Sequence, residues 1–122
     1  MYYIYMLRCK DNSIYTGLTT DMNRRMDEHF NKDDKCAKYT LNHTVKKLEI
    51  AWETETRVMA SKLEYHIKKL SKNNKEELIH NYNELDKLLG NKVECSNYKV
   101  LGGSEIWQKQ SGTKEKKERQ SI

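Results

Sequence analysis

Two phenols, a guanidinium and an imidazole occur near the start of the chain, and between them they can exchange protons and hold an anion. Tyr5 and Tyr15 fall on the same face of two predicted neighbouring strands, and Gly17 lies further along that face, where a backbone or a ligand can approach closely. Arg25 and His29 fall on the stripe of the next helix that faces the sheet, where a charged group needs a partner or a site. Each residue alone is explained by ordinary packing. Together they predict a polar patch in the place of a core.

Glu64 is a further candidate, on a helix predicted over residues 57–70. It flanks the inward-facing stripe of that helix, three residues before Ile67. One interpretation is a surface glutamate paired with Lys68, four residues later. The other is a hard oxygen ligand for Mg²⁺, because that ion takes only one or two protein carboxylates together with water and substrate phosphate. The spacing leaves both interpretations open.

The elements that must position these residues follow from the hydrophobic pattern. The predicted strands cover residues 2–9, 14–19 and 48–53, and the predicted helices cover residues 22–30, 57–70 and 74–90. The first strand is apolar on both faces and therefore central, and the third is half-buried, with Leu48, Ile50 and Trp52 on one face. Thr20 or Asp21 caps the first helix, Asn73 or Asn74 caps the third, and residues 31–43 form a loop. The order β-β-α-β-α-α indicates an α+β fold with a small three-stranded, mostly antiparallel sheet flanked by helices.

Composition restricts the class of protein. The 122 residues suit one domain, predicted over residues 1–90, with residues 91–122 as a C-terminal extension that ends in a charged, partly disordered tail. Residues 98–101 of this extension could form one short extra strand. A net charge of +5 favours a polyanionic partner. We expect no leader peptide and no membrane span, since no apolar run is long enough. The three cysteines match no zinc pattern and indicate free thiols in the cytoplasm.

The first two strands carry a recognisable pair of motifs. Tyr3-Ile4-Tyr5, followed after nine residues by Tyr15-Thr16-Gly17, resembles the paired motif that names the GIY-YIG nuclease family. Arg25 stands eight residues after the glycine, His29 four residues further on, and Glu64 on the later helix completes the pattern. The resemblance covers residues 2–80 and is greatest with the small stand-alone bacterial members. In two departures, Tyr3 replaces the first glycine, and the late phosphate-binding asparagine of many members has no clear match.

The resemblance implies a metal-dependent endonuclease that hydrolyses phosphodiester bonds. Tyr5, Tyr15, Arg25 and His29 would be the catalytic residues, with Tyr5 taking a proton from the attacking water, and Glu64 would hold one Mg²⁺ or Mn²⁺ ion. Candidates for further contact with nucleic acid are Arg8, Lys35 and Lys38. We expect DNA rather than RNA, structures or ends rather than a long sequence, and a role in DNA repair or recombination.

Two other functions remain open at the level of sequence. The same fold and basic surface would serve a nucleic-acid-binding adaptor that cleaves nothing, and the missing asparagine is compatible with weak or absent catalysis. A protein-interaction domain with a structural polar patch is the third possibility. The complete set of five site residues favours the enzyme, because a pure binder does not need all of them. The oligomeric state is not indicated by the sequence.

Overall fold

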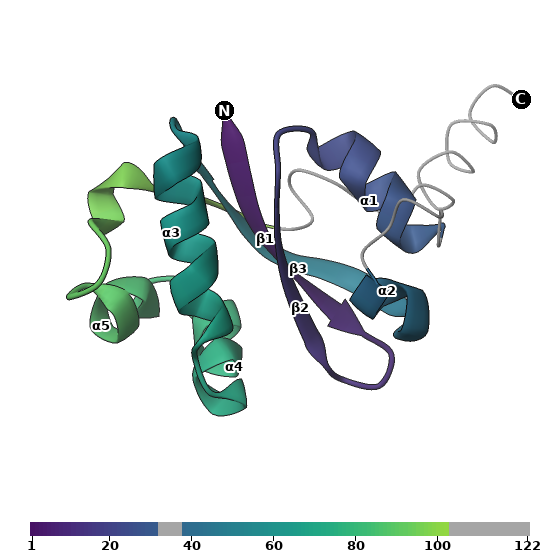
Figure 1. Ribbon diagram of the computed structural model, residues 1–122. Coiled ribbons are helices and arrows are strands. Elements are labelled where there is room, and N and C mark those ends of the chain that lie inside the picture. The colour runs from purple at the N-terminus through teal and green to yellow at the C-terminus, as the bar shows by residue number, and fades with distance from the viewer. Residues whose placement is uncertain (32–37, 103–122) are drawn as a thin grey trace, which may run out of the picture.

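The computed structural model describes residues 1–31 and 38–102 of the chain (Figure 1). Its elements are β1 (Tyr2–Cys9), β2 (Ile14–Thr19), α1 (Met22–Phe30), α2 (Lys38–Asn42), β3 (Val45–Thr54), α3 (Arg57–Lys68), α4 (Lys72–His80), α5 (Glu84–Leu89), the 3₁₀ turn η1 (Cys95–Asn97) and β4 (Lys99–Gly102). The strand order is β2-β1-β3-β4, and every neighbouring pair is antiparallel. The α+β class is confirmed. The sheet has four strands where the fold prediction had three, and β4 lies where the sequence allowed one short extra strand.

The central strand β1 separates two cores. Ile4 and Met6 pack against α3, α4 and α5 on one face of the sheet. Tyr5 and Leu7 point to the other face, where Met26 of α1 covers them. Figure 1 shows α3, α4 and α5 on one side of the sheet and α1 and α2 on the other. Burial on both faces explains why residues 2–9 carry apolar side chains at both parities.

A bulge in β3 exchanges the faces of its side chains. Met6 pairs with Ile50, but Leu7 pairs with Leu48, so Glu49 is the extra residue. The predicted alternation is therefore wrong at this point, because Ile50 lies in the core beneath α3 whereas Leu48 lies in the core beneath α1. Side chains of both parities are buried along β3, so this strand is more than half-buried.

Two other parts of the chain, the segment before β3 and the segment after α3, also differ from the prediction. Residues 38–42, expected within a loop, form the short helix α2. The helix expected over residues 74–90 is two helices, since the backbone of Asn81 leaves the helical region at φ −145° and ψ 99°. The N-cap of α4 is Ser71, whose hydroxyl accepts a hydrogen bond from the Asn74 amide at 3.1 Å. Ser71 thus takes the capping role predicted for Asn73 or Asn74.

The chain after Gly90 continues the same core. Val93 and Tyr98 are buried against α3–α5, and the Tyr98 hydroxyl donates a hydrogen bond to the carbonyl of Met59 at 2.7 Å. β4 then pairs with β3. The predicted domain boundary at residue 90 therefore divides a packed core. The charged tail predicted near the C-terminus lies outside the described residues.

Arg8 links β1 to the β3 bulge and to α4. Its guanidinium donates two hydrogen bonds to Glu76, at 2.5 and 2.6 Å, and its Nε donates one to Glu49 at 2.9 Å. Only 8 % of Arg8 is exposed. The prediction that Arg8 contacts nucleic acid does not fit this position, because both carboxylates already occupy the guanidinium on the α4 side of the sheet. Its role here is to join three elements.

We expect Glu76→Gln to flatten the loss of stability in acid. The hydrogen bond from Arg8 lowers the pKa of Glu76 to about 2 from its ordinary 4.5. A carboxylate with a lowered folded-state pKa stabilises the fold fully above its unfolded-state pKa, and the contribution is lost as the pH falls from about 5 toward 2. Chemical unfolding at a series of pH values should show this slope in the wild type and a weaker slope in the variant. Glu77→Gln, an exposed neighbour on α4, is the matched control, and a wild-type slope in Glu76→Gln would refute the assignment.

Candidate active site

A chain of hydrogen bonds runs from β1 through α1 to α2. The Tyr5 hydroxyl lies 2.7 Å from His29 Nε2, and His29 Nδ1 lies 2.8 Å from Thr40 Oγ1. The exposed fractions of the three residues are 0 %, 1 % and 0 %. Burial, helped by the nearby charge of Arg25, lowers the pKa of His29 to about 4, so the ring is neutral at pH 7. A neutral imidazole with its proton on Nδ1, donated to Thr40, offers Nε2 as an acceptor for the Tyr5 hydroxyl.

The turn from β2 into α1 places His29 over β1. Asp21, one of the two predicted caps, is the N-cap of α1, and its carboxylate accepts a hydrogen bond from the Arg24 amide at 3.0 Å. Met22, Met26 and His29 then follow at spacings of four and three residues, which puts all three on the buried side of α1. His29 is therefore both a core residue, with each ring nitrogen hydrogen-bonded, and a member of the polar group around Tyr5.

Gly17 makes room for the Tyr5 ring. The two residues are directly paired across β1 and β2. A Cβ atom at Gly17 would lie 2.5 Å from Cζ of Tyr5 and 2.8 Å from Cε2 of Tyr15, far inside van der Waals contact. The sequence predicted close approach by another backbone or a ligand at this glycine. In the structure, the phenol of Tyr5 itself takes that space.

Tyr15 lies in a continuous group of aromatic rings on the same face. Its ring centre is 6.2 Å from that of Tyr5 and 5.3 Å from that of His29. Tyr39 of α2 stacks on Tyr15 at 5.7 Å and on His43 at 4.1 Å. The predicted shared face of Tyr5 and Tyr15 is confirmed. Tyr39 packs onto its own domain, so α2 closes this side of the site.

Arg25 stands at the partly exposed side of the group. Its guanidinium donates a hydrogen bond to Glu28 at 2.6 Å, and Arg24 also reaches that carboxylate, at 3.2 Å. Burial and the nearby Tyr15 raise the pKa of the Tyr5 phenol above its ordinary value, although a hydrogen bond and the charge from Arg25 act in the opposite direction. Sequence reasoning missed Glu28, because a glutamate three or four residues after an arginine is usually a surface ion pair. Here it is buried and orients Arg25.

Glu64 of α3 lies within electrostatic reach of Tyr5. Its negative charge is one of the causes that raise the pKa of that phenol. The side chain is 24 % exposed and pairs with Lys68 at 3.2 Å, so the ion pair considered from the sequence is present. Within residues 1–31 and 38–102, no group of three or more His, Cys, Asp or Glu side chains could hold a metal ion. A single, partly exposed carboxylate does fit an ion such as Mg²⁺ that is held mainly by water and substrate phosphate.

The candidate site thus contains most of the predicted residues. Those brought together on one face of the sheet are Tyr5, Tyr15, Gly17, Arg25 and His29. Thr40 was missed, because its contact with His29 spans eleven residues and depends on a helix that the sequence did not indicate. Lys38 is exposed at the start of α2, and Lys35 lies outside the described residues.

Comparisons with known proteins place the chain in a family. The sequence model of the GIY-YIG catalytic domain matches residues 1–77. The UPF0213 protein FN1575 of Fusobacterium nucleatum is 47 % identical over 78 residues, which are 64 % of this chain and 76 % of that protein. The UPF0213 protein YhbQ of Salmonella arizonae is 36 % identical over 88 residues, 72 % of this chain and 86 % of that protein. The match with the solution NMR structure of the UPF0213 protein BH0048 from Bacillus halodurans spans 72 % of this chain and 97 % of the solved chain, at 38 % identity and a TM-score of 0.42. The chain belongs to the GIY-YIG nuclease family, as its paired tyrosine motifs predicted.

Proposed function

We propose that the protein is a divalent-metal-dependent endonuclease that hydrolyses phosphodiester bonds in nucleic acid. The observation that carries this proposal is the hydrogen-bonded chain from Tyr5 through His29 to Thr40, whose Tyr5 end lies beside Arg25. Activation of water next to a phosphate uses a phenol, a neutral imidazole and a guanidinium together. A module that only binds nucleic acid has no use for a buried imidazole aligned on a phenol.

In this proposal Tyr5 relays a proton to His29. A phenol with the ordinary pKa of ~10 is ionised in only about one molecule in a thousand at pH 7. The pKa of Tyr5 is above that value, so Tyr5 alone is ionised still less often and is a poor base. The neutral His29 ring has Nε2 2.7 Å from the hydroxyl. As the attacking water gives a proton to the Tyr5 oxygen, Tyr5 passes its own proton to Nε2. The imidazole stores the proton, and the phenol keeps the water aligned.

Arg25 binds the phosphate and controls access to Tyr5. The phenol is fully buried and is hydrogen-bonded to Arg25, so in this proposal water enters as Arg25 moves from Glu28 onto the incoming phosphate. The planar guanidinium then holds two non-bridging oxygens and stabilises the charge that builds on them. The positive charge of Arg25 lowers the pKa of His29. The negative charge of the bound phosphate compensates it, and this effect on His29 then becomes weaker. Phosphate binding therefore makes the imidazole a stronger base.

Glu64 would hold one divalent ion, Mg²⁺ or Mn²⁺. Such an ion supplies neutralising charge at a phosphate oxygen and at the departing oxygen. Glu64 is partly exposed, and its charge acts on Tyr5. A phosphate held by Arg25 would therefore lie between Arg25 and an ion held by Glu64.

We infer DNA as the substrate in preference to RNA, recognised by its structure or its ends, in repair or recombination. The net charge of +5 and the exposed Lys38 support a polyanionic substrate. No helix in the described part of the chain is long and apolar enough to cross a bilayer. Cys9 and Cys95 are free thiols, which supports the cytoplasm as the proposed location.

The test is cleavage of labelled single-stranded, duplex, flapped and branched DNA, and of matching RNA, with Mg²⁺, with Mn²⁺ and with excess chelator. We expect cutting of at least one DNA structure that stops in chelator. Cutting that persists in excess chelator would refute the metal requirement. Binding without cutting on every substrate would refute the nuclease and support the adaptor function.

We expect Thr40→Val to lower kcat by about 10- to 100-fold, the range for losing a partner that orients a functional histidine, whereas Thr40→Ser should stay near the wild type. Valine keeps the volume of threonine but removes the oxygen that fixes His29 Nδ1. Nitrogen NMR of the His29 ring should show the proton on Nδ1 in the wild type and in Thr40→Ser, and a mixture of tautomers in Thr40→Val. A wild-type kcat in a folded Thr40→Val variant would contradict this role.

A further inference from the structure

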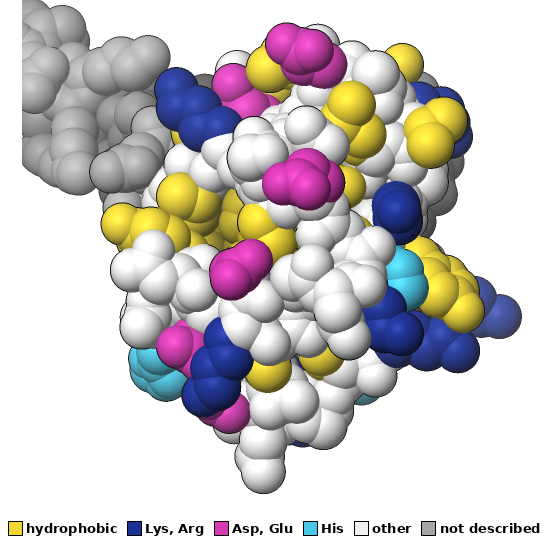
Figure 2. Space-filling model, turned by 90° about the vertical axis from the view of Figure 1, so that its left-hand side faces the viewer, with side chains coloured by type: hydrophobic (Ala, Val, Ile, Leu, Met, Phe, Trp, Pro, Cys, Tyr) yellow, Lys and Arg dark blue, Asp and Glu magenta, His cyan; other side chains and the backbone are white. Residues whose placement is uncertain are grey.

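The outer face of α3 exposes an aromatic ring and a neighbouring aliphatic side chain to solvent. Tyr65 is 55 % exposed and Val58 is 78 % exposed. With Arg57, Ser61 and Lys62 they line an open depression of about 570 Å³. Figure 2, a view from the left-hand side of Figure 1, shows hydrophobic side chains exposed among basic, acidic and histidine side chains. This combination needs an explanation, because α3 does not use these residues for its own packing.

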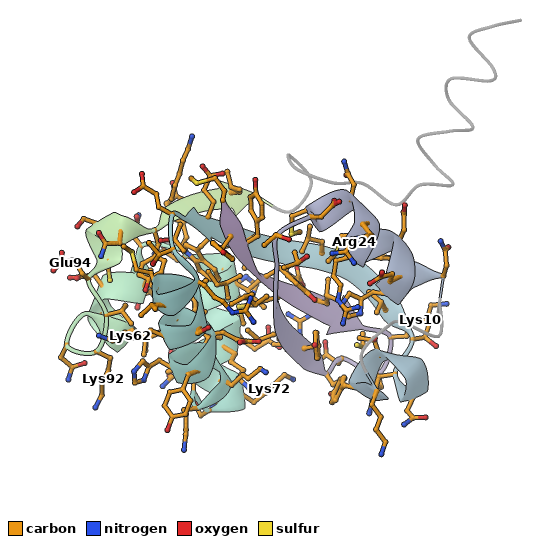
Figure 3. The ribbon with its side chains drawn as sticks, turned by 45° about the horizontal axis from the view of Figure 1, so that its top comes forward. Lys10, Arg24, Lys62, Lys72, Lys92 and Glu94 are labelled. Carbon is orange, nitrogen blue, oxygen red and sulfur yellow. The ribbon has the colours of Figure 1, made fainter. Side chains whose placement is uncertain are left out.

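The charge of this face is positive. Arg57 and Lys62 border the depression, and Nζ of Lys69 lies 5.2 Å from the centre of the Tyr65 ring. Figure 3 shows that Lys62 projects from α3 away from the sheet. The single acidic residue of α3 is Glu64. A polyanion therefore fits this surface. Within α3, only Glu64 would repel it, and Glu64 is the residue proposed to hold the metal ion.

The depression lies on α3, the helix that also carries Glu64 of the proposed active site. Arg57, Ser61, Glu64 and Tyr65 stand at the spacings of four, seven and eight residues that share one side of a helix. A strand held at Glu64 has to pass around the helix by about one residue, roughly 100°, to reach Tyr65. The distance from the metal position to the ring is set within one rigid helix, so no movement of the protein is needed to engage both.

We propose that this face binds an unpaired stretch of the nucleic-acid strand that leaves the active site, with a base stacked on Tyr65 and its phosphates beside Arg57 and Lys62. The inference rests on the proposed function and names the form of its substrate. Stacking on an exposed ring requires a base that is free of its complement, and a shallow depression admits a flat base but not a paired duplex. The enzyme then selects a flap, an end or a single-stranded region adjoining the scissile bond.

The test measures binding in excess chelator, where cleavage cannot contribute. A short labelled single strand and the duplex of the same sequence are titrated with the full chain. We expect Tyr65→Ala to weaken single-strand binding by about 5- to 150-fold, the range for one lost base–aromatic stack, and to change duplex binding much less. Tyr65→Phe, which keeps the ring, should bind like the wild type. The matched control is Tyr82→Ala, since Tyr82 is 52 % exposed in the turn before α5 and should not affect binding.

The phosphate contacts are tested by salt dependence. Lys62→Gln should reduce the slope of log Kd against log salt concentration by about 0.7, the value for one contact to a single strand. Lys92→Gln, an exposed lysine after α5, should keep the wild-type slope. Equal slopes for the two variants would overturn the placement of phosphates beside Lys62.

The outcomes for Tyr65 separate this inference from the proposed function. If Tyr65→Ala binds single strands as the wild type does while the wild type cuts, the surface assignment is overturned and the nuclease stands. If no substrate is cut but Tyr65→Ala loses single-strand binding and Tyr82→Ala does not, the surface assignment is supported and the nuclease is refuted. Equal losses in Tyr65→Ala and Tyr82→Ala, or binding of an acidic peptide in preference to the single strand, would also overturn the assignment.

Discussion

The Tyr5→Phe variant should cleave nucleic acid about 10²- to 10⁴-fold more slowly than the wild type, the range for removing a positioned proton-transfer group. The substitution deletes a single oxygen, the one that lies 2.7 Å from His29 Nε2. Without it, the attacking water has no partner that passes its proton to the imidazole. Single-turnover cleavage at saturating protein is the measurement, because it reports the chemical step apart from binding.

Stability must be followed in the same experiment. Phenylalanine leaves a buried imidazole nitrogen unpaired, which costs about 1–3 kcal/mol, so rates are compared at a temperature where both proteins are folded. Tyr3→Phe is the matched control, since Tyr3 lies on the same face of β1, two residues away. We expect it to cut at the wild-type rate. A folded Tyr5→Phe variant that cuts as fast as Tyr3→Phe would show that the phenol carries no proton.

The Glu64→Gln variant should lose about 10³-fold in metal-dependent cleavage, because a bound ion contributes several kcal/mol of charge stabilisation in the transition state. Glutamine keeps the shape of the side chain but removes the charge that would hold the ion. Its effect on stability should be within about 0.5 kcal/mol, since the carboxylate is partly exposed and pairs with an exposed lysine on the same helix. Cleavage is measured as the concentration of Mg²⁺ is raised.

Lys68→Gln distinguishes the two interpretations of Glu64. It breaks the same ion pair but keeps the carboxylate. If Glu64 holds a metal ion, Lys68→Gln should cut at least as well as the wild type and need no more Mg²⁺, because a competing cation has been removed. If the ion pair is the whole role of Glu64, the two variants should behave alike. That second outcome would remove Glu64 from the site.

The parts of the site that were predictable follow from strict local periodicity. Side chains alternate across a strand, so the hairpin of β1 and β2 had to place Tyr5 and Tyr15 on one face. The helical spacing from Met22 likewise had to bring His29 to the buried side of α1. The close approach at Gly17 was also predictable, although the sequence assigned that space to a backbone or a ligand and the structure gives it to the Tyr5 ring. None of these inferences needs a contact between distant segments.

The features that were not predictable depend on tertiary structure. A bulge adds one residue without changing the apolar pattern, and Leu48 and Ile50 are apolar whichever face they occupy. Arg8 and Glu76 are 68 positions apart in the sequence, and the residues around each of them do not indicate that the two form an ion pair. Thr40 belongs to a helix of five residues in a polar stretch of sequence. The local pattern there does not predict that the Thr40 hydroxyl contacts the His29 ring.

The short length of α2 has a consequence for how many molecules are ready to react at any moment. A five-residue helix is not stable alone and depends on its docking to the domain, whereas β1 is paired on both edges and covered on both faces. Tyr5 is thus fixed by the most protected strand, and Thr40 by a segment whose detachment costs far less than unfolding the domain. The fraction of molecules with the productive imidazole tautomer then rises with the fraction that has α2 docked. Substitutions in α2 can therefore raise or lower the rate by shifting that population, with the phenol and the core left as they are.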